Sequence, residues 1–185
     1  MTKTLIKIAA VLVLLSFGAS VFYYYAPQPV FAAASPISDF QDERDTQDVL
    51  NLFEKDRYWL ISSEDYDPSY ALKTRSPNKR DNRYFGKLNI KVLREDSKFV
   101  GFVAYYMKNF FLGQLLFVGV NPDFRGKGYA QKLMQYAIDD MKKQGASMIS
   151  LVTRTSNLAA QAVYKKLGFS VTHEEDGFVY FELRV

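Results

Sequence analysis

The hydrophobic pattern of the chain changes period near residue 121, and this change limits the folds open to it. Three strand-like runs come first, at residues 87–93, 99–108 and 114–120. The connections between them are short, which favours an antiparallel meander. Apolar residues then recur at the spacing of one helix face up to Gly145; they are Ala130, Leu133, Met134, Ala137, Ile138 and Met141. Strands followed by an amphipathic helix predict an α+β domain in which the helix covers the sheet.

Further elements are expected on both sides of this unit. They are a short strand around residues 37–40, a helix at 46–60, a turn-rich stretch at 62–86, a strand at 147–153 and a helix at 157–167. The second helix is expected to bury its apolar residues, which are Leu158, Ala159, Ala162, Val163 and Leu167. A terminal hairpin follows, with "EEDG" as its turn. The order of elements predicts a mixed sheet.

Composition excludes several classes of site. The 185 residues suffice for one ordinary domain, which we place at residues 35–185. Cysteine is absent and His173 is the only histidine, so disulfides, thiol nucleophiles and Cys- or His-rich metal sites are excluded and no metal is expected. Lys3 and Lys7 supply half of the net charge of +4, which leaves the rest of the chain close to neutral.

The first 34 residues form a separate segment. Residues 8–26 are 19 uncharged, mainly apolar residues behind Lys3 and Lys7. They predict either a signal peptide cut after Ala32 or Ala34, or an uncleaved transmembrane anchor with tyrosines 23–25 at the interface; a buried core helix is the third possibility. Because the lysines precede the segment, the domain is expected to be exported or membrane-anchored on the extracytoplasmic side. Insertion in the opposite direction would give a cytoplasmic-facing anchor.

The stretch "NPDFRGKGYA" at residues 121–130 joins the third strand of the meander to the helix. This arrangement directs the backbone N–H groups of residues 126–130 into one concavity, where the start of the helix favours an anion. Gly126 and Gly128 allow close approach and strained φ angles, and the guanidinium of Arg125 matches phosphate oxygens. The stretch lacks the P-loop pattern and the third glycine of a dinucleotide fingerprint. A pyrophosphate site and an ordinary glycine-rich turn are the two interpretations.

Two motifs resemble those of the GNAT superfamily of N-acetyltransferases. The first is R-x-x-G-x-A at Arg125, Gly128 and Ala130. The second is "NLAAQAVYKKLGF", which matches at Asn157, Ala160, Tyr164, Gly168 and Phe169. With the element order, the resemblance covers residues 87 to 183. It implies a three-layer α+β fold, in which a mixed central sheet of six to seven strands has helices on both faces.

The resemblance also implies acetyl-CoA as co-substrate and a set of residues that bind it. The pyrophosphate would lie on Arg125, Gly126, Lys127, Gly128, Tyr129 and Ala130. The pantetheine would pair with the strand at Val118 and Val120, like an added strand, inside a splay between this strand and residues 147–153. Asn157 is expected to contact the cofactor near the second helix.

The implied reaction is direct transfer of the acetyl group to a primary amine. Tyr164 is the catalytic residue that we expect to stabilise the leaving thiolate; the alternative is a helix residue that packs on Phe169. Backbone N–H groups of residues 118–120 would stabilise the oxyanion. Relatives often carry a carboxylate on the strand before the loop, but residues 114–117 of this chain include none. A water chain to a distant acid, His173 or solvent would have to accept the proton.

Other functions stay open at this stage. A catalytically silent acyl-CoA-binding domain, or a membrane-tethered interaction domain, would not need the missing base. Residues 73–87 hold six basic residues and one acid, and they could bind nucleic acid or lipid headgroups, shape an acceptor pocket or be a solvated loop; the near-neutral body makes nucleic acid the least favoured partner. Glu64, Asp65 and Asp67 could select a cationic amine. The acceptor is a small-molecule or protein amine, and a homodimer through the terminal hairpin is possible.

Overall fold

A computed structural model describes residues 36–61, 66–77 and 86–185 of the chain. The described part forms one compact unit, Pro36–Val185. The predicted signal or anchor lies outside the described residues, as do Glu64, Asp65 and the centre of the basic stretch at 73–87. None of the described helices combines the length and the apolar content needed to cross a bilayer.

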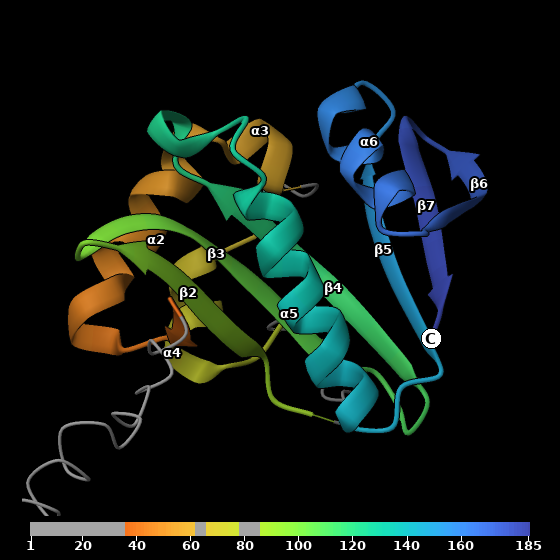
Figure 1. The fold of residues 1–185 in the computed structure, drawn as a ribbon, viewed down its shortest axis with the longest axis horizontal. Coiled ribbons are helices and arrows are strands. Elements are labelled where there is room, and N and C mark those ends of the chain that lie inside the picture. Colours follow the sequence, from red (N-terminus) through yellow and green to blue (C-terminus); the bar gives the residue numbers. More distant parts are fainter. Residues whose placement is uncertain (1–35, 62–65, 78–85) are drawn as a thin grey trace, which may run out of the picture. The chain divides into compact units, whose positions relative to one another are not determined.

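The centre of the unit is a seven-stranded mixed sheet with the order β1-β2-β3-β4-β5-β7-β6 (Figure 1). Its strands are β1 (Ile37–Asp39), β2 (Asn89–Glu95), β3 (Lys98–Met107), β4 (Leu112–Val120), β5 (Met148–Arg154), β6 (Ser170–Glu175) and β7 (Phe178–Arg184). Neighbouring strands are antiparallel except for β4 and β5, which are parallel. The predicted meander corresponds to β2, β3 and β4, and the predicted terminal hairpin corresponds to β6 and β7.

Helices cover both faces of the sheet, so the predicted three-layer architecture is confirmed. The helices are α2 (Asp42–Lys55), α3 (Arg57–Leu60), α4 (Pro68–Thr74), α5 (Tyr129–Lys143) and α6 (Leu158–Lys166), with a 3₁₀ turn, η1, at Pro122–Phe124. One core cluster joins α5 and the Tyr164 side of α6 to the sheet. A second cluster joins α2 and α4 to the opposite face of β2 and β3. Figure 1 shows α5 and α6 in front of the sheet and α2 behind it.

Helix α5 lies as its sequence periodicity predicts. Five of the six residues on the predicted face are at most 3% exposed: Leu133, Met134, Ala137, Ile138 and Met141. They pack on β3, β4 and β5. The sixth residue, Ala130, is only half-buried because it lines the functional cavity described below.

Helix α6 buries a different face from the one predicted. Leu158, Ala159 and Ala162 are exposed, and Tyr164 is the buried residue of the helix. Tyr164 and Phe169 anchor this segment on β5 and β7. The small apolar side chains on the other side of α6 therefore face an open cavity, and the prediction that they are buried was wrong.

Two differences concern the segment before the meander. The predicted helix at 46–60 begins earlier, at Asp42, and breaks at Asp56, so that α2 and the short α3 are separate. Acidic residues in the first turn of α2 complement its N-terminus. Helix α4 was not predicted, although Asp67 caps it and Pro68 occupies its first turn, a known signal for a helix start.

A buried ion-pair network fixes α2 against the sheet. Asp45 has no exposed surface and accepts hydrogen bonds from the backbone N–H of Gln41 at 2.8 Å, from Arg44 Nε at 2.8 Å and from Arg94 Nε at 3.0 Å. Burial opposes ionisation of Asp45, but these hydrogen bonds outweigh it and hold the pKa of the carboxyl group below its usual value. The network joins the first turn of α2 to β2.

We therefore expect Asp45→Asn to lower the free energy of unfolding by about 3 kcal/mol, because it removes the fully buried charge of the network and weakens its hydrogen bonds to Arg44 and Arg94. Asp42→Asn is the control, since Asp42 is exposed and pairs with Arg75 on the surface, where a pair contributes about 0–1 kcal/mol. Because the pKa of Asp45 is depressed, its contribution should be complete above the ordinary pKa of ~3.9 and disappear as the pH falls below it. Urea unfolding at pH 7 and pH 3 measures both effects; an equal loss in the two variants would contradict the network.

Candidate active site

The sheet opens between β4 and β5. Their parallel pairing covers only three pairs: Leu112↔Met148, Gly113↔Ile149 and Gln114↔Ser150. The hydroxyl of Ser150 donates to Gln114 Oε1 at 2.9 Å at the last pair. Beyond it, β4 continues to Val120 in pairing with β3 alone among the described strands. The register shift opposite Ala104 and Tyr105 leaves Leu116 as an extra residue at the start of this opening.

A cavity of about 560 Å³ occupies the opening. Its walls come from the end of β4, the end of β5, the start of α6 and the segment around α3. The predicted residues that line it are Val118, Val120, Arg125, Ala130, Asn157 and Tyr164. The cavity therefore brings together residues from both sequence motifs, which are about thirty residues apart in the chain.

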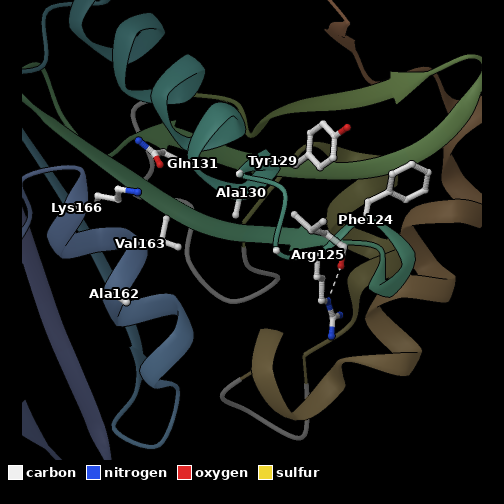
Figure 2. Close-up of a pocket in the computed structure, with 11 residues that line it drawn as sticks. Phe124, Arg125, Tyr129, Ala130, Gln131, Ala162, Val163 and Lys166 are labelled. Carbon is white, nitrogen blue, oxygen red and sulfur yellow. Dashed lines mark hydrogen bonds between the residues drawn. The ribbon is translucent and has the colours of Figure 1, made fainter.

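A second cavity, of about 350 Å³, adjoins the first at the start of α5 (Figure 2). Val120, Arg125, Ala130 and Val163 line both cavities. Its other predicted lining residues are Gly126, Gly128 and Tyr129. Figure 2 shows Ala162, Val163 and Lys166 of α6 facing Ala130 and Gln131 of α5 across it. The two cavities form one site that extends from the start of α5 to Tyr164.

The loop before α5 has the geometry of an anion site. Gly126 and Gly128 have φ angles of 76° and 83°, and a side chain at either position would point into open space. Gly128 is the N-cap of α5 and offers no side-chain acceptor, so the first N–H groups of this helix have no intrahelical partner. The glycines thus allow the backbone turn that points these N–H groups toward a ligand.

The long side chains of the loop have protein partners. Arg125, shown in Figure 2, donates from Nε to the carbonyl of Val120 at 3.0 Å and forms an ion pair with Asp56, so its guanidinium is held by these two partners. Lys127 Nζ lies over the ring of Phe124 and donates to the carbonyl of Asp123 at 3.4 Å. The hydroxyl of Tyr129 donates to Glu95 Oε2 at 2.5 Å. In this arrangement the loop would offer an anion backbone N–H groups, and the Arg125 side chain contacts Val120 and Asp56; its predicted contact with a phosphate stays a prediction.

Lys166 and Gln131 were missed by the sequence analysis. Both line the smaller cavity, and Lys166 brings a cation from α6 to it, across from the start of α5 (Figure 2). The signal was present, because Lys166 lies within the second motif two residues after Tyr164. The location of Lys166 depends on which face of α6 packs on the sheet, and the sequence pattern predicted that face incorrectly.

Tyr164 is 7% exposed, and its ring packs edge-on against Phe181 at 5.5 Å between centroids. Phe169 is a further ring neighbour at 6.3 Å, so the packing role considered for Tyr164 is also present. Burial raises the pKa of Tyr164 to about 12, with a hydrogen bond from Thr153 opposing the shift. The phenol is therefore protonated at neutral pH, and it can donate a hydrogen bond into the cavity but cannot act as a base.

Asn157 connects α6 to β5. Its Oδ1 accepts from the N–H of Ala160 at 3.3 Å, which caps the helix, and its Nδ2 donates to Thr153 Oγ1 at 3.3 Å. Asn157, Thr153 and Tyr164 thus form one polar group on the wall of the larger cavity. The predicted contact of Asn157 with a cofactor stays a prediction, in addition to this capping role.

The other acid–base candidates lie elsewhere. His173 is exposed on β6 and stacks on Tyr180 at 4.1 Å, and it lines neither cavity. Asp67 accepts a hydrogen bond from the N–H of Tyr70 as the cap of α4. Among the described residues, Asp56 is the one carboxylate that lines the larger cavity, and it pairs with Arg125. The described walls thus provide no carboxylate without a partner to accept a proton.

Gly128→Val is expected to weaken binding of coenzyme A at least tenfold, because a β-branched residue at positive φ displaces the loop that directs the N–H groups. Gly177→Val is a matched control: Gly177 has a φ of 79°, also borders open space and lies in the β6–β7 turn. Both variants should lose similar stability. Calorimetric titration with coenzyme A, and with inorganic pyrophosphate as a second probe, distinguishes them. Equal affinities in the two variants would contradict the anion site.

Comparison with known proteins places this geometry in a family. The model of the acetyltransferase (GNAT) family matches residues 46–169. The [ribosomal protein bS18]-alanine N-acetyltransferase of Salmonella typhimurium is 28% identical over 127 residues, which cover 68% of this chain and 80% of that protein. N-alpha-acetyltransferase 30 of Schizosaccharomyces pombe is 40% identical over 57 residues, 31% of this chain and 38% of that protein. The match to the Escherichia coli bS18 enzyme is 38% identical and spans 36% of that protein's length and 29% of this chain.

Solved structures agree with the sequence comparison at the level of the fold. The ribosomal-protein-S18-alanine N-acetyltransferase of Escherichia coli superposes with a TM-score of 0.57 at 21% identity, over 80% of this chain and 92% of that one. The PaiA N-acetyltransferase of Thermoplasma acidophilum, solved in complex with coenzyme A, gives 0.62 at 19% identity, over 80% and 98%. With its opened mixed sheet, its glycine loop and a family match over most of its length, this chain belongs to the acetyltransferase (GNAT) family.

Proposed function

We propose that the protein is an N-acetyltransferase that uses acetyl-CoA and transfers the acetyl group directly to a primary amine. The observation that carries this proposal is the continuous cavity from the start of α5 to Tyr164. One end of it has the backbone donors that an anion needs. The other end has a neutral phenol that can donate a hydrogen bond.

The shape and chemistry of the cavity fit coenzyme A. The N–H groups of residues 126–130 and the ammonium of Lys166 would hold the pyrophosphate. The edge of β4 at Val118 and Val120 faces the opening and would pair with the amide groups of the pantetheine. The coenzyme A complex of the Thermoplasma relative supports the same ligand here.

Acetyl-CoA supplies the acetyl group as a thioester. The amine nitrogen forms a bond to the carbonyl carbon, the bond from carbon to sulfur breaks, and the nitrogen loses a proton. Full proton transfer from Tyr164, with a pKa of about 12, to a thiolate with a conjugate pKa of ~8.5 would be uphill by about 5 kcal/mol. Tyr164 therefore stabilises the leaving sulfur by a hydrogen bond, and solvent provides the final proton exchange.

The proton of the amine goes to water in this scheme. No described carboxylate on the cavity wall lacks a partner, so the acceptor has to lose its proton to solvent or enter as the neutral amine. An alkyl ammonium group has a pKa of ~10.4, so the neutral fraction increases tenfold per pH unit below that value. The rate should follow that fraction.

Tyr164→Phe is expected to lower kcat about a hundredfold, because the hydrogen bond to the sulfur is lost. Affinity for acetyl-CoA should stay within about twofold, because the ring and its packing are retained. Tyr180→Phe, outside both cavities, is the control. The kcat/KM of the wild type should rise with pH up to the pKa of the acceptor and show no fall below pH 11, since Tyr164 is still protonated there.

A second candidate function is a domain that binds acyl-CoA without turnover, and the missing carboxylate on β4 favours it. Such a protein would bind acetyl-CoA and show no acetylation above the solvent rate with any amine. A Tyr164→Phe variant that acetylates at the wild-type rate would instead show that the protein is an enzyme whose mechanism does not use Tyr164.

We also propose that residues 8–26 direct the chain to a membrane, as an anchor or as a signal that is removed. The support is the run of 19 uncharged residues behind Lys3 and Lys7. Expression of the full chain with a C-terminal tag, followed by membrane fractionation and intact mass, is the test. We expect either the whole chain in the membrane fraction or a product that begins after Ala32 or Ala34. The whole chain in the cytosolic fraction would contradict both forms of the proposal.

A further inference from the structure

Helix α3 is connected to both sides of the opening between β4 and β5. At its start, Asp56 pairs with Arg125, which lies on the loop after β4. At its end, Arg154 of β5 donates to two backbone carbonyls, from Nε to Tyr58 at 2.7 Å and from Nη2 to Ile61 at 3.3 Å. One arginine from each side of the opening therefore holds this four-residue helix beside the cavity.

Arg154 also supports the aromatic side chains of α3. Its guanidinium carbon lies 4.2 Å from the ring centroid of Tyr58 and 5.1 Å from that of Phe178. The ring of Tyr58 in turn meets Trp59 edge-on, with centroids 4.8 Å apart. Trp59 lines the larger cavity while 46% of it is exposed, which leaves its indole available to a ligand. Arg154, Tyr58 and Trp59 thus form a row of contacts that ends at the cavity wall.

Large apolar side chains line the cavity together with Trp59, among them Leu60, Leu116, Phe117, Val152 and Leu158. The polar side chains of Thr153, Ser156, Asn157 and Tyr164 in the same lining are uncharged. Val152 and Leu158 are 41% and 72% exposed, a large exposure for such side chains. The described lining contains two charged groups, Asp56 and Arg125, and they neutralise each other. A charged group next to the amine of the acceptor would lose its hydration here without a partner, whereas an apolar group would gain contacts.

The apolar side chains of the cavity also affect how the acceptor amine can lose its proton without a catalytic base. Removing an ammonium group from water lowers its pKa, so apolar surroundings raise the fraction of neutral amine that can attack. With coenzyme A in its proposed place along β4 and the start of α5, an acceptor that puts its apolar group beside Trp59 would carry its amine into these surroundings. The lining and the absence of a free carboxylate from the described walls therefore favour the same class of acceptor.

We propose that α3 is the acceptor-recognition element, that Trp59 is its specificity-determining contact and that Arg154 is the residue that positions it. The acceptor is then a primary amine on an apolar, uncharged group. This chemistry is found in an arylalkylamine and in the N-terminus of a peptide that begins with an apolar residue. The assignment rests on the proposed acetyltransferase function.

The test uses the full chain, purified in mild detergent, with acetyl-CoA consumption as the readout. The small-amine arm compares 2-phenylethylamine with ethanolamine and with γ-aminobutyrate. The peptide arm compares tetrapeptides that differ only in their first residue, Leu, Ser or Asp. In at least one arm we expect the apolar acceptor to exceed the others at least tenfold in kcat/KM. The arm that responds identifies the source of the amine.

Two variants test the residues. Trp59→Ala should raise the KM of the apolar acceptor about tenfold and reduce the preference over polar acceptors to less than threefold, while the KM of acetyl-CoA stays within twofold. Phe111→Ala is the control, because Phe111 has similar exposure (54%) and lies before the other end of β4. Arg154→Lys keeps the charge but not both hydrogen bonds, so it should raise the acceptor KM with kcat and the KM of acetyl-CoA little changed.

The outcomes separate the two proposals. Acetyl-CoA binding without turnover of any acceptor overturns the acetyltransferase function and this assignment with it. Turnover that is equal for polar, charged and apolar acceptors, or a preference unchanged in Trp59→Ala, overturns the assignment alone. Equal increases of both KM values in Arg154→Lys would show a general structural role and remove Arg154 from the proposal.

Discussion

The early end of pairing between β4 and β5 is the constraint on which the site depends. Parallel strands that stayed paired to their ends would satisfy each other's backbone groups and close the sheet. Here the pairing stops after Gln114 and Ser150, and the extra residue at Leu116 lies where β4 turns away. A strand edge that pairs with no described strand and faces a cavity is a natural binding surface for another extended chain. The cavity, the exposed face of α6 and the location of Tyr164 all follow from this opening.

Arginines join the parts of the site that the opening separates. Arg125 belongs to the loop that starts α5, yet its guanidinium pairs with Asp56 at the start of α3. Arg154 joins the end of α3 to β5. Asp45 holds α2, the helix that precedes α3, against β2 through its hydrogen bonds with Arg44 and Arg94. The α3 side of the cavity is therefore held by charge-assisted hydrogen bonds, while apolar packing holds α5 on the sheet.

The sequence predicted what depends on local pattern. The meander, the buried face of α5, the terminal hairpin and the glycine loop have clear periodicities or turn residues, and all are present. Helix α6 shows where this reasoning fails. Its apolar residues predict a buried face, but only the tertiary opening determines that Ala159 and Ala162 border a cavity while Tyr164 is buried. The same holds for the Arg125 side chain, whose partner Asp56 is 69 residues away in the chain. It also holds for Trp59, whose neighbour Tyr58 contacts Arg154 of the distant strand β5.

Amide hydrogen exchange with and without coenzyme A probes the backbone N–H groups that would bind the cofactor. We expect coenzyme A to slow exchange in residues 115–131, which comprise the part of β4 beyond its pairing with β5 and the loop that starts α5. Smaller protection is expected in α6, and none in the β6–β7 hairpin. Protection confined to other segments, or no protection at saturating coenzyme A, would contradict the assignment of this opening as the cofactor site.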